Sequence, residues 1–311
     1  MRKFLLPVDG SESSRCAARH IAERVLDGEA LELHLLNVQV RRHVYPGLRK
    51  VVSQAMIDEY AQAQADIAIG LVIPILDELG IRYSTHIGFG NVEFGIADHV
   101  QRLGCEHIVM GTRGLSALAG FALGSIATRV ITLVDVPVTL VTTPDARSGS
   151  PSVMARESGT AMAARAPTRA PRITLVPVDG SENSDRAIDY VLGESQAGVK
   201  REIILLNVQT RYPTGRGWDE ITPLILAEAY QDEGNLALRS ARHRLEQAGV
   251  AHRLAIAIGA AGETIAKYVQ DMVCDNVIMG TRGLGAGGNF FLGSVAVKVV
   301  RLAGVPVTLV R

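Results

Sequence analysis

The chain repeats itself once from end to end, and no other sequence feature restricts its possible folds as strongly. Four pairs of segments match at offsets of 170 or 169 residues: LPVDGSE at 6–12 and VPVDGSE at 176–182, LLNVQ at 35–39 and 205–209, MGTRGL at 110–115 and 279–284, and VPVTLV at 136–141 and 305–310. The matches keep the same order over the whole length. This indicates a duplicated domain rather than a solenoid of short units.

A change of composition marks the boundary between the two copies. Residues 144–171 consist mainly of Ala, Arg, Ser, Pro, Thr and Gly, with hardly a large apolar side chain. Such a segment cannot bury enough surface to offset the entropy lost on ordering it. Because 311 residues suit two domains of ordinary size, we expect one domain at 1–143, a flexible linker at 144–171 and a second domain at 172–311.

The overall composition excludes several classes of protein. With 47% hydrophobic and 21% charged residues, it is that of a soluble globular protein. Lys and Arg total 32, as do Asp and Glu, so no net charge attracts nucleic acid. No apolar run approaches the roughly 18 residues of a membrane span, and the first residues read as a strand rather than a signal peptide. We expect neither a nucleic-acid nor a membrane partner.

The three cysteines, Cys16, Cys105 and Cys274, are far apart and form no CxxC pair. Their number and spacing argue against a zinc site and against a disulfide framework. A reducing, cytoplasmic compartment is therefore expected.

The fold class follows from the alternation of apolar runs and helical patterns within each copy. In the first copy, strands are predicted at 4–8, 31–38, 81–87, 107–110 and 136–141, and helices at 13–26, 49–79, 92–103 and 125–134. Continuous apolarity in the strands is typical of a parallel sheet buried on both faces, and Pro74 should interrupt the second helix. We predict an α/β fold with two tandem doubly wound domains, each a five-stranded parallel sheet of order 3-2-1-4-5 flanked by helices.

A glycine-rich loop follows the fourth strand of each copy. In such sheets, ligands bind at the carboxyl ends of the strands where the winding direction reverses, which here lies between the first and fourth strands. Both copies place two glycines, nine further residues and then Gly-Ser in this loop, at Gly111, Gly114, Gly124 and Ser125 and at Gly280, Gly283, Gly293 and Ser294. Glycines allow close approach of backbone amides to phosphate, and a helix start offers free amides. Ser125 is expected to cap its helix and to offer its hydroxyl.

This loop, after the opening P-V-D-G-S-E, resembles the ATP-binding members of the universal stress protein family over both copies. The resemblance implies that each copy binds ATP, or ADP or AMP, together with Mg. It places the base near Pro7, Asp9, Val38 and Met110, and near Pro177, Asp179, Val208 and Met279. It assigns the phosphates and ribose to the glycines and serines of the two loops. To these we add Arg113 and Arg282, which lie inside the loops, as candidate phosphate contacts.

Some of these residues also have a purely structural interpretation. Asp9 and Asp179 could be turn or cap residues, since Asp-Gly-Ser is favourable turn chemistry. Met110 and Met279 could simply fill the core.

The resemblance implies a stress-response sensor or regulator that acts through its nucleotide-bound state. One alternative is a slow Mg-dependent ATPase, against which stands the absence of a G-x-x-x-x-G-K-[S/T] loop with its phosphate-binding lysine. Another is an interaction scaffold without nucleotide, against which stand the retained loop glycines. No catalytic residue is assigned, and no metal-binding residue is identified.

The last strands, 136–141 and 305–310, are apolar and would lie at sheet edges, where they can pair with another edge. The resemblance implies that such strands pair between domains. They would form either an intramolecular pseudo-dimer or a homodimer of two chains.

Overall fold

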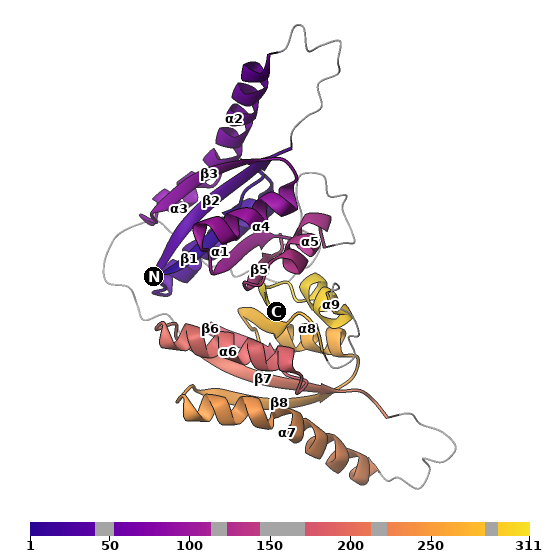
Figure 1. Ribbon diagram of the computed structural model, residues 1–311. Helices are drawn as coiled ribbons and strands as arrows, with labels where there is room; N and C mark the ends of the chain where they lie inside the picture. The colour runs from indigo at the N-terminus through magenta and orange to yellow at the C-terminus, as the bar shows by residue number, and fades with distance from the viewer. Residues whose placement is uncertain (41–52, 113–122, 144–171, 213–222, 284–291) are drawn as a thin grey trace.

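The computed structural model describes residues 1–40, 53–112, 123–143, 172–212, 223–283 and 292–311 (Figure 1). The strands of the first half are β1 (Arg2–Pro7), β2 (Leu31–Gln39), β3 (Tyr83–Phe89), β4 (His107–Gly111) and β5 (Val138–Val141). Its helices are α1 (Glu12–Leu26), α2 (Gln54–Gly70), α3 (Ile73–Asp77), α4 (Val92–Leu103) and α5 (Ser125–Leu133). The expected linker, 144–171, lies outside the described residues.

The second half repeats this order of elements. Its strands are β6 (Arg172–Pro177), β7 (Arg201–Gln209), β8 (His252–Ile258), β9 (Asn276–Gly280) and β10 (Val307–Val310). Its helices are α6 (Glu182–Gln196), α7 (Pro223–Gln247), α8 (Ala261–Asp271) and α9 (Ser294–Leu302).

Within the described residues, all these strands form one sheet in the order β3-β2-β1-β4-β5-β10-β9-β6-β7-β8. Pairing is parallel inside each half, as between β1 and β2 and between β4 and β5. Each half therefore has the order 3-2-1-4-5, which confirms the predicted α/β fold. The halves meet where β5 and β10 pair antiparallel, with Thr139 opposite Thr308 (Figure 1).

Local sequence explains how α1 begins after β1. The side chain of Ser11 accepts a hydrogen bond from the Ser14 amide at 3.2 Å, so it caps the helix. Gly10 precedes it with a φ of 81°, a left-handed conformation that glycine adopts without the strain a side chain would add. Ser181 and Gly180 repeat this arrangement before α6.

Proline interrupts the helical segment of the first half as the sequence predicts. Helix α2 ends at Gly70, and the short α3 begins at Ile73 with Pro74 in its first turn, where a missing amide hydrogen is tolerated. In the second half, α7 runs unbroken from Pro223 to Gln247.

The two faces of the sheet are covered differently. Apolar side chains of α4, α5, α8 and α9 pack with the strands into one cluster that is continuous across both halves. On the opposite face, α1 with α2 and α3 covers one cluster in the first half, and α6 with α7 covers a separate cluster in the second half. Among the helices that the structure describes, none combines the length and the apolar character that a membrane span requires.

Candidate functional site

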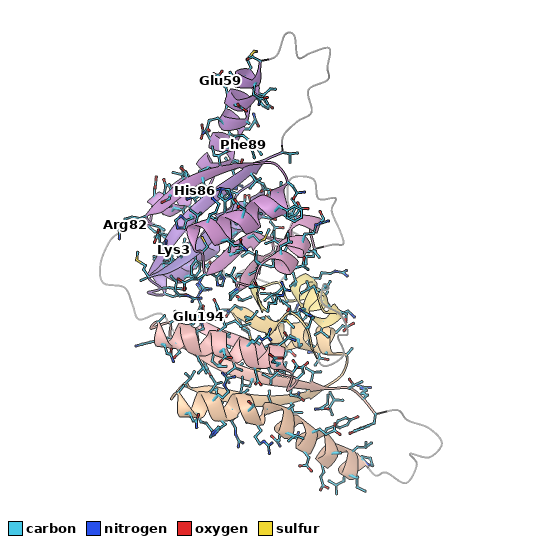
Figure 2. All side chains as sticks on the ribbon, in the orientation of Figure 1. Lys3, Glu59, Arg82, His86, Phe89 and Glu194 are labelled. Carbon is cyan, nitrogen blue, oxygen red and sulfur yellow. The ribbon has the colours of Figure 1, made fainter. Side chains whose placement is uncertain are left out.

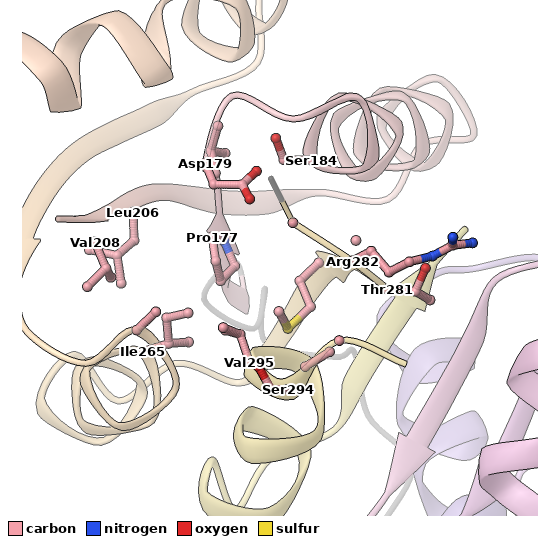
Figure 3. Close-up of a pocket in the computed structure, with 17 residues that line it drawn as sticks. Pro177, Asp179, Ser184, Leu206, Val208, Ile265, Thr281, Arg282, Ser294 and Val295 are labelled. Atoms are coloured by element: carbon pink, nitrogen blue, oxygen red, sulfur yellow. The ribbon is translucent and has the colours of Figure 1, made fainter. Parts of the chain in front are cut away.

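A cavity of about 410 Å³ lies at the carboxyl ends of β6 and β9 in the second half. β6 and β9 are neighbours in the sheet, and this is the switch point at which the sequence predicts a ligand site. Figure 3 shows the lining residues arranged around one hollow. Every residue predicted for the second copy lines it: Pro177, Asp179, Val208, Met279, Gly280, Arg282, Gly283, Gly293 and Ser294.

One end of the cavity is apolar. Leu206 and Val208, at the end of β7, lie near Ile265 of α8 in Figure 3, and Ala261 at the start of α8 also lines the wall. Met279 is buried in the continuous core and also borders the cavity. Met279 is therefore a core residue that also forms part of the cavity wall.

Asp179 lines the cavity beside Gly283. One of its carboxylate oxygens accepts a hydrogen bond from the Ser181 amide at 3.0 Å, as Asp9 does from Ser11 in the first half. The turn interpretation of both aspartates thus has a physical basis. The other oxygen of Asp179 lies so close to Gly283 that a Cβ on that residue would overlap it. The carboxylate therefore supports the turn and also contributes to the cavity wall.

The glycines that end β4 and β9 have a packing role in addition to any contact with a ligand. A Cβ on Gly280 would lie 2.7 Å from the carbonyl oxygen of Asn183, in the first turn of α6. A Cβ on Gly111 would overlap Ser13, at the matching place in α1. Glycine is required at these two positions because the strand end runs directly against a helix start.

The N-terminus of α9 forms another part of the cavity wall. The first intrahelical hydrogen bond runs from the Val297 amide to the Gly293 carbonyl at 3.0 Å. The amides of Ser294, Val295 and Ala296 precede that bond, and all three residues line the cavity. A helix start with amides outside the helical ladder favours a negatively charged ligand group.

The expectation that Ser125 caps its helix is wrong. The N-cap of α5 is Gly124 and that of α9 is Gly293, and neither helix has a side-chain cap bond. Ser125 and Ser294 are instead the first helical residues. The backbone conformation at the glycine, rather than a serine hydroxyl, starts each helix.

The first half repeats the backbone framework of this site. Gly124 donates to the carbonyl of Thr112 at 2.8 Å, as Gly293 donates to that of Thr281. Seven predicted residues of the first copy hold places equivalent to those in the second: Pro7, Asp9, Val38, Met110, Gly111, Gly124 and Ser125. Arg113 and Gly114 lie outside the described residues.

The side chain of Arg282, the other arginine candidate, extends in Figure 3 to the side of the cavity away from Val208. Sequence reasoning missed the other lining residues, Val178, Ser184, Leu206, Ala261, Ile265, Thr281, Val295 and Ala296. The Thr281 hydroxyl is buried without a hydrogen-bond partner among the described residues, and so is that of Thr112. The two threonines each follow the first glycine of the loop, and this shared position was the sequence signal that could have identified them.

A second cavity, of about 550 Å³, lies between β3 and α4 in the first half. His86, Asp98, His99 and Arg102 line it, and His86 Nε2 is 3.1 Å from His34 Nδ1. Burial lowers the pKa of both His34 and His86. Within the described ranges, no group of three or more His, Cys, Asp or Glu side chains is placed to hold a metal ion.

Comparison with known proteins identifies the same family in both halves. The model of the universal stress protein family matches residues 1–142 and 171–311. A universal stress protein of Methanocaldococcus jannaschii is 29% identical over 145 residues, which cover 46% of this chain and 83% of that protein. A universal stress protein of Thermus aquaticus is 34% identical over 149 residues, which cover 44% of this chain and 96% of that protein.

Among solved structures, a universal stress protein from Archaeoglobus fulgidus shares the fold over both halves. The TM-score is 0.66 at 20% identity, and the alignment covers 99% of this chain and 96% of that one. At this identity the likeness concerns the fold.

Proposed function

The chain belongs to the universal stress protein family, with a family domain in each half, and from this premise we propose that each half binds an adenine nucleotide. We propose further that the protein acts in a stress response as a sensor or regulator through its nucleotide-bound state. ATP with Mg is the proposed ligand, with ADP or AMP as alternatives.

The carrying observation is that one cavity joins an apolar end to the free amides of a helix start. A volume of about 410 Å³ falls within the range of small-molecule sites. Val208, Ile265 and Ala261 would hold the base, while the α9 amides and Gly283 would face the phosphates. The residues present therefore fit an adenine nucleotide, which would supply a flat apolar base and a polyanionic tail.

Binding rather than turnover is proposed because the cavity provides little for phosphoryl transfer. The sequence has no G-x-x-x-x-G-K-[S/T] lysine to contact the terminal phosphates. Among the described lining residues, Asp179 is the single carboxylate, and one of its oxygens is already engaged in the turn. A slow Mg-dependent ATPase and a nucleotide-independent scaffold are the alternatives that the experiment below separates.

The test is calorimetric titration of Mg-ATP into the full chain, compared between two neighbouring variants. Ala261 lines the apolar end, whereas Ala260, the exposed residue before it, does not. Ala261→Trp should fill the base end and reduce the number of binding sites from two to one, while Ala260→Trp should leave both. A phosphate-release assay on the same samples measures turnover.

Each outcome decides between the candidates. Equal binding by both tryptophan variants would place the ligand elsewhere, and no binding by the unmodified protein would favour the scaffold. Release of phosphate on every binding cycle would favour the ATPase. We also propose a cytoplasmic location, which the free, buried state of Cys16, Cys105 and Cys274 supports.

A further inference from the structure

A buried ion pair joins the two halves on the face covered by α1 and α6. Arg24 Nη2 lies 2.5 Å from Glu194 Oε1, and the two side chains are only 4% and 1% exposed. Glu194 lies on α6 at the boundary with the first half (Figure 2). Arg24 also contacts Glu29, and Glu194 also contacts Arg201 at 3.1 Å. Charges buried this deeply are tolerated only when they are paired, so the fit between the halves depends on them.

Arg24 and Glu194 occupy the same position of the repeat. Helix α1 begins at Glu12 and α6 at Glu182, so both residues are the thirteenth of their helices. Two copies of the first half paired in the same way would place arginine against arginine, and two copies of the second half would place glutamate against glutamate. At this position of the repeat, only unlike halves bring opposite charges together.

A second set of ion pairs disfavours the pairing of two second halves. Arg172 of β6 lies 3.1 Å from Glu23 and also forms an ion pair with Asp27, both of the first half. The positions equivalent to these carboxylates in the second half are Gly193 and Ala197. A pair of two second halves would therefore leave Arg172 buried without a carboxylate.

Hydrogen bonds connect the buried pair to the junction of the sheet. Tyr190 Oη lies 2.7 Å from Glu194 Oε1 and 3.0 Å from His107 Nδ1. His107 Nε2 lies 2.8 Å from the Thr139 hydroxyl, which in turn lies 2.7 Å from that of Thr308. In the other half, the places of Tyr190 and His107 are taken by His20 and Asn276. This connected series also requires one half of each kind.

The charges in this series are maintained in the folded protein. Burial raises the pKa of Glu194, but the attraction of Arg24 and Arg201 outweighs it and holds the pKa below its usual value. Glu194 therefore stays ionised near neutral pH.

We propose that this buried charge pattern is a pairing code, which makes the first half accept the second half as its partner and excludes pairing of either half with a copy of itself. The final strands then join unlike halves. This inference goes beyond the proposed nucleotide binding, since none of the pairing residues named above lines the cavity.

The test uses disulfide cross-linking in the full chain. Thr139 and Thr308 face each other in the β5–β10 ladder with their hydroxyl oxygens 2.7 Å apart, so cysteine sulfurs at these positions can meet. Thr139→Cys with Thr308→Cys should cross-link under mild oxidation, and either single cysteine should give no covalent dimer. The unmodified protein, whose own cysteines are buried, is the background control. A covalent dimer formed only by the double-cysteine protein would still join unlike halves and support the code.

Charge-changing substitutions then test whether the buried charges determine which halves pair. Glu194→Arg in the double-cysteine protein should reduce cross-linking at least tenfold, and Glu194→Gln should reduce it less. Glu182→Arg, on the exposed start of the same helix, is the matched control and should have no effect. Adding Arg24→Glu to Glu194→Arg restores an opposite-charge pair across the boundary and should recover part of the cross-link. Recovery is partial because each new charge also meets a like charge of its own half, at Glu29 or at Arg201.

Three results would overturn the proposal. The first is a covalent dimer from a single-cysteine protein with native charges, since this needs like halves to pair and does not depend on any charge variant folding. The second is an equal effect of Glu194→Arg and Glu182→Arg. The third is failure of the Arg24→Glu reversal to raise cross-linking above that of Glu194→Arg alone.

Discussion

Replacing His107 by asparagine should change how the stability of the protein depends on pH. His107 is fully buried, its ring is stacked on Phe4 at 4.6 Å between centroids, and both of its ring nitrogens have hydrogen-bond partners. Burial, followed by repulsion from Arg24 and Arg2, lowers its pKa well below the usual 6.5. Asparagine is a natural test residue because Asn276 holds the same position in the second half, where it bonds Thr174.

The magnitude follows from proton linkage. Below about pH 6.5 the unfolded chain binds a proton at His107 while the folded protein does not, so the unfolded state gains stability as the pH falls. Each such histidine reduces the free energy of unfolding by about 1.4 kcal/mol per pH unit in that range. Between pH 7.5 and 5, His107 should therefore account for about 2 kcal/mol of lost stability. His20 is also fully buried with a lowered pKa, so it adds a similar loss that the substitution leaves in place.

Urea unfolding at several pH values, for the unmodified protein and His107→Asn, measures the difference. The variant should be less stable near neutral pH, because it loses the contact with Phe4. The difference in the free energy of unfolding between the two proteins should then narrow as the pH falls, until the pH reaches the pKa of His107 in the folded protein. Parallel pH profiles would show that His107 titrates alike in both states, and the reasoning from burial would be refuted.

Three further outcomes are expected. Gly283→Ala should destabilise the protein by about 0.5–1.5 kcal/mol, because the Asp179 carboxylate must move and weaken its hydrogen bond from the Ser181 amide. Gly193→Ala, in an exposed helical position with open space around it, should stabilise by about 0.5–1 kcal/mol in the same urea assay. Gly10→Ala should cost about 1–2 kcal/mol because its φ is 81°; an unchanged midpoint would contradict this. Burial raises the pKa of Cys105 and Cys274 to about 11, so a thiol reagent near pH 8 should label them at least about tenfold more slowly in the folded than in the unfolded protein, and equal rates would show that they are accessible.

The sequence by itself determined the architecture, because the signals involved are local and occur twice. Continuous apolar runs mark buried parallel strands, and Pro74 interrupts its helix through its own covalent structure. The order 3-2-1-4-5 then places the turn after β6 beside the loop after β9, so the sequence also located the cavity residues of the second half.

Local signals were insufficient where two structural roles meet at one residue. The Gly-Ser pair at 124–125 was expected to cap a helix through serine, but the glycine backbone holds the N-cap position. The need for glycine at 111 and 280 arises from contact with a helix start nearly a hundred residues earlier in the chain. A spacing pattern identifies such residues without showing whether packing or a ligand requires them.

Only the tertiary structure decided how the two halves recognise each other. Arg24 and Glu194 each stand on an amphipathic helix, where a charge ordinarily faces solvent. Whether such a charge is exposed or buried depends on a surface supplied by the other half of the chain. That surface forms only when β5 and β10 pair and bring residues far apart in the sequence into contact. The opposite charges of Arg24 and Glu194 therefore become an ion pair only in the folded chain.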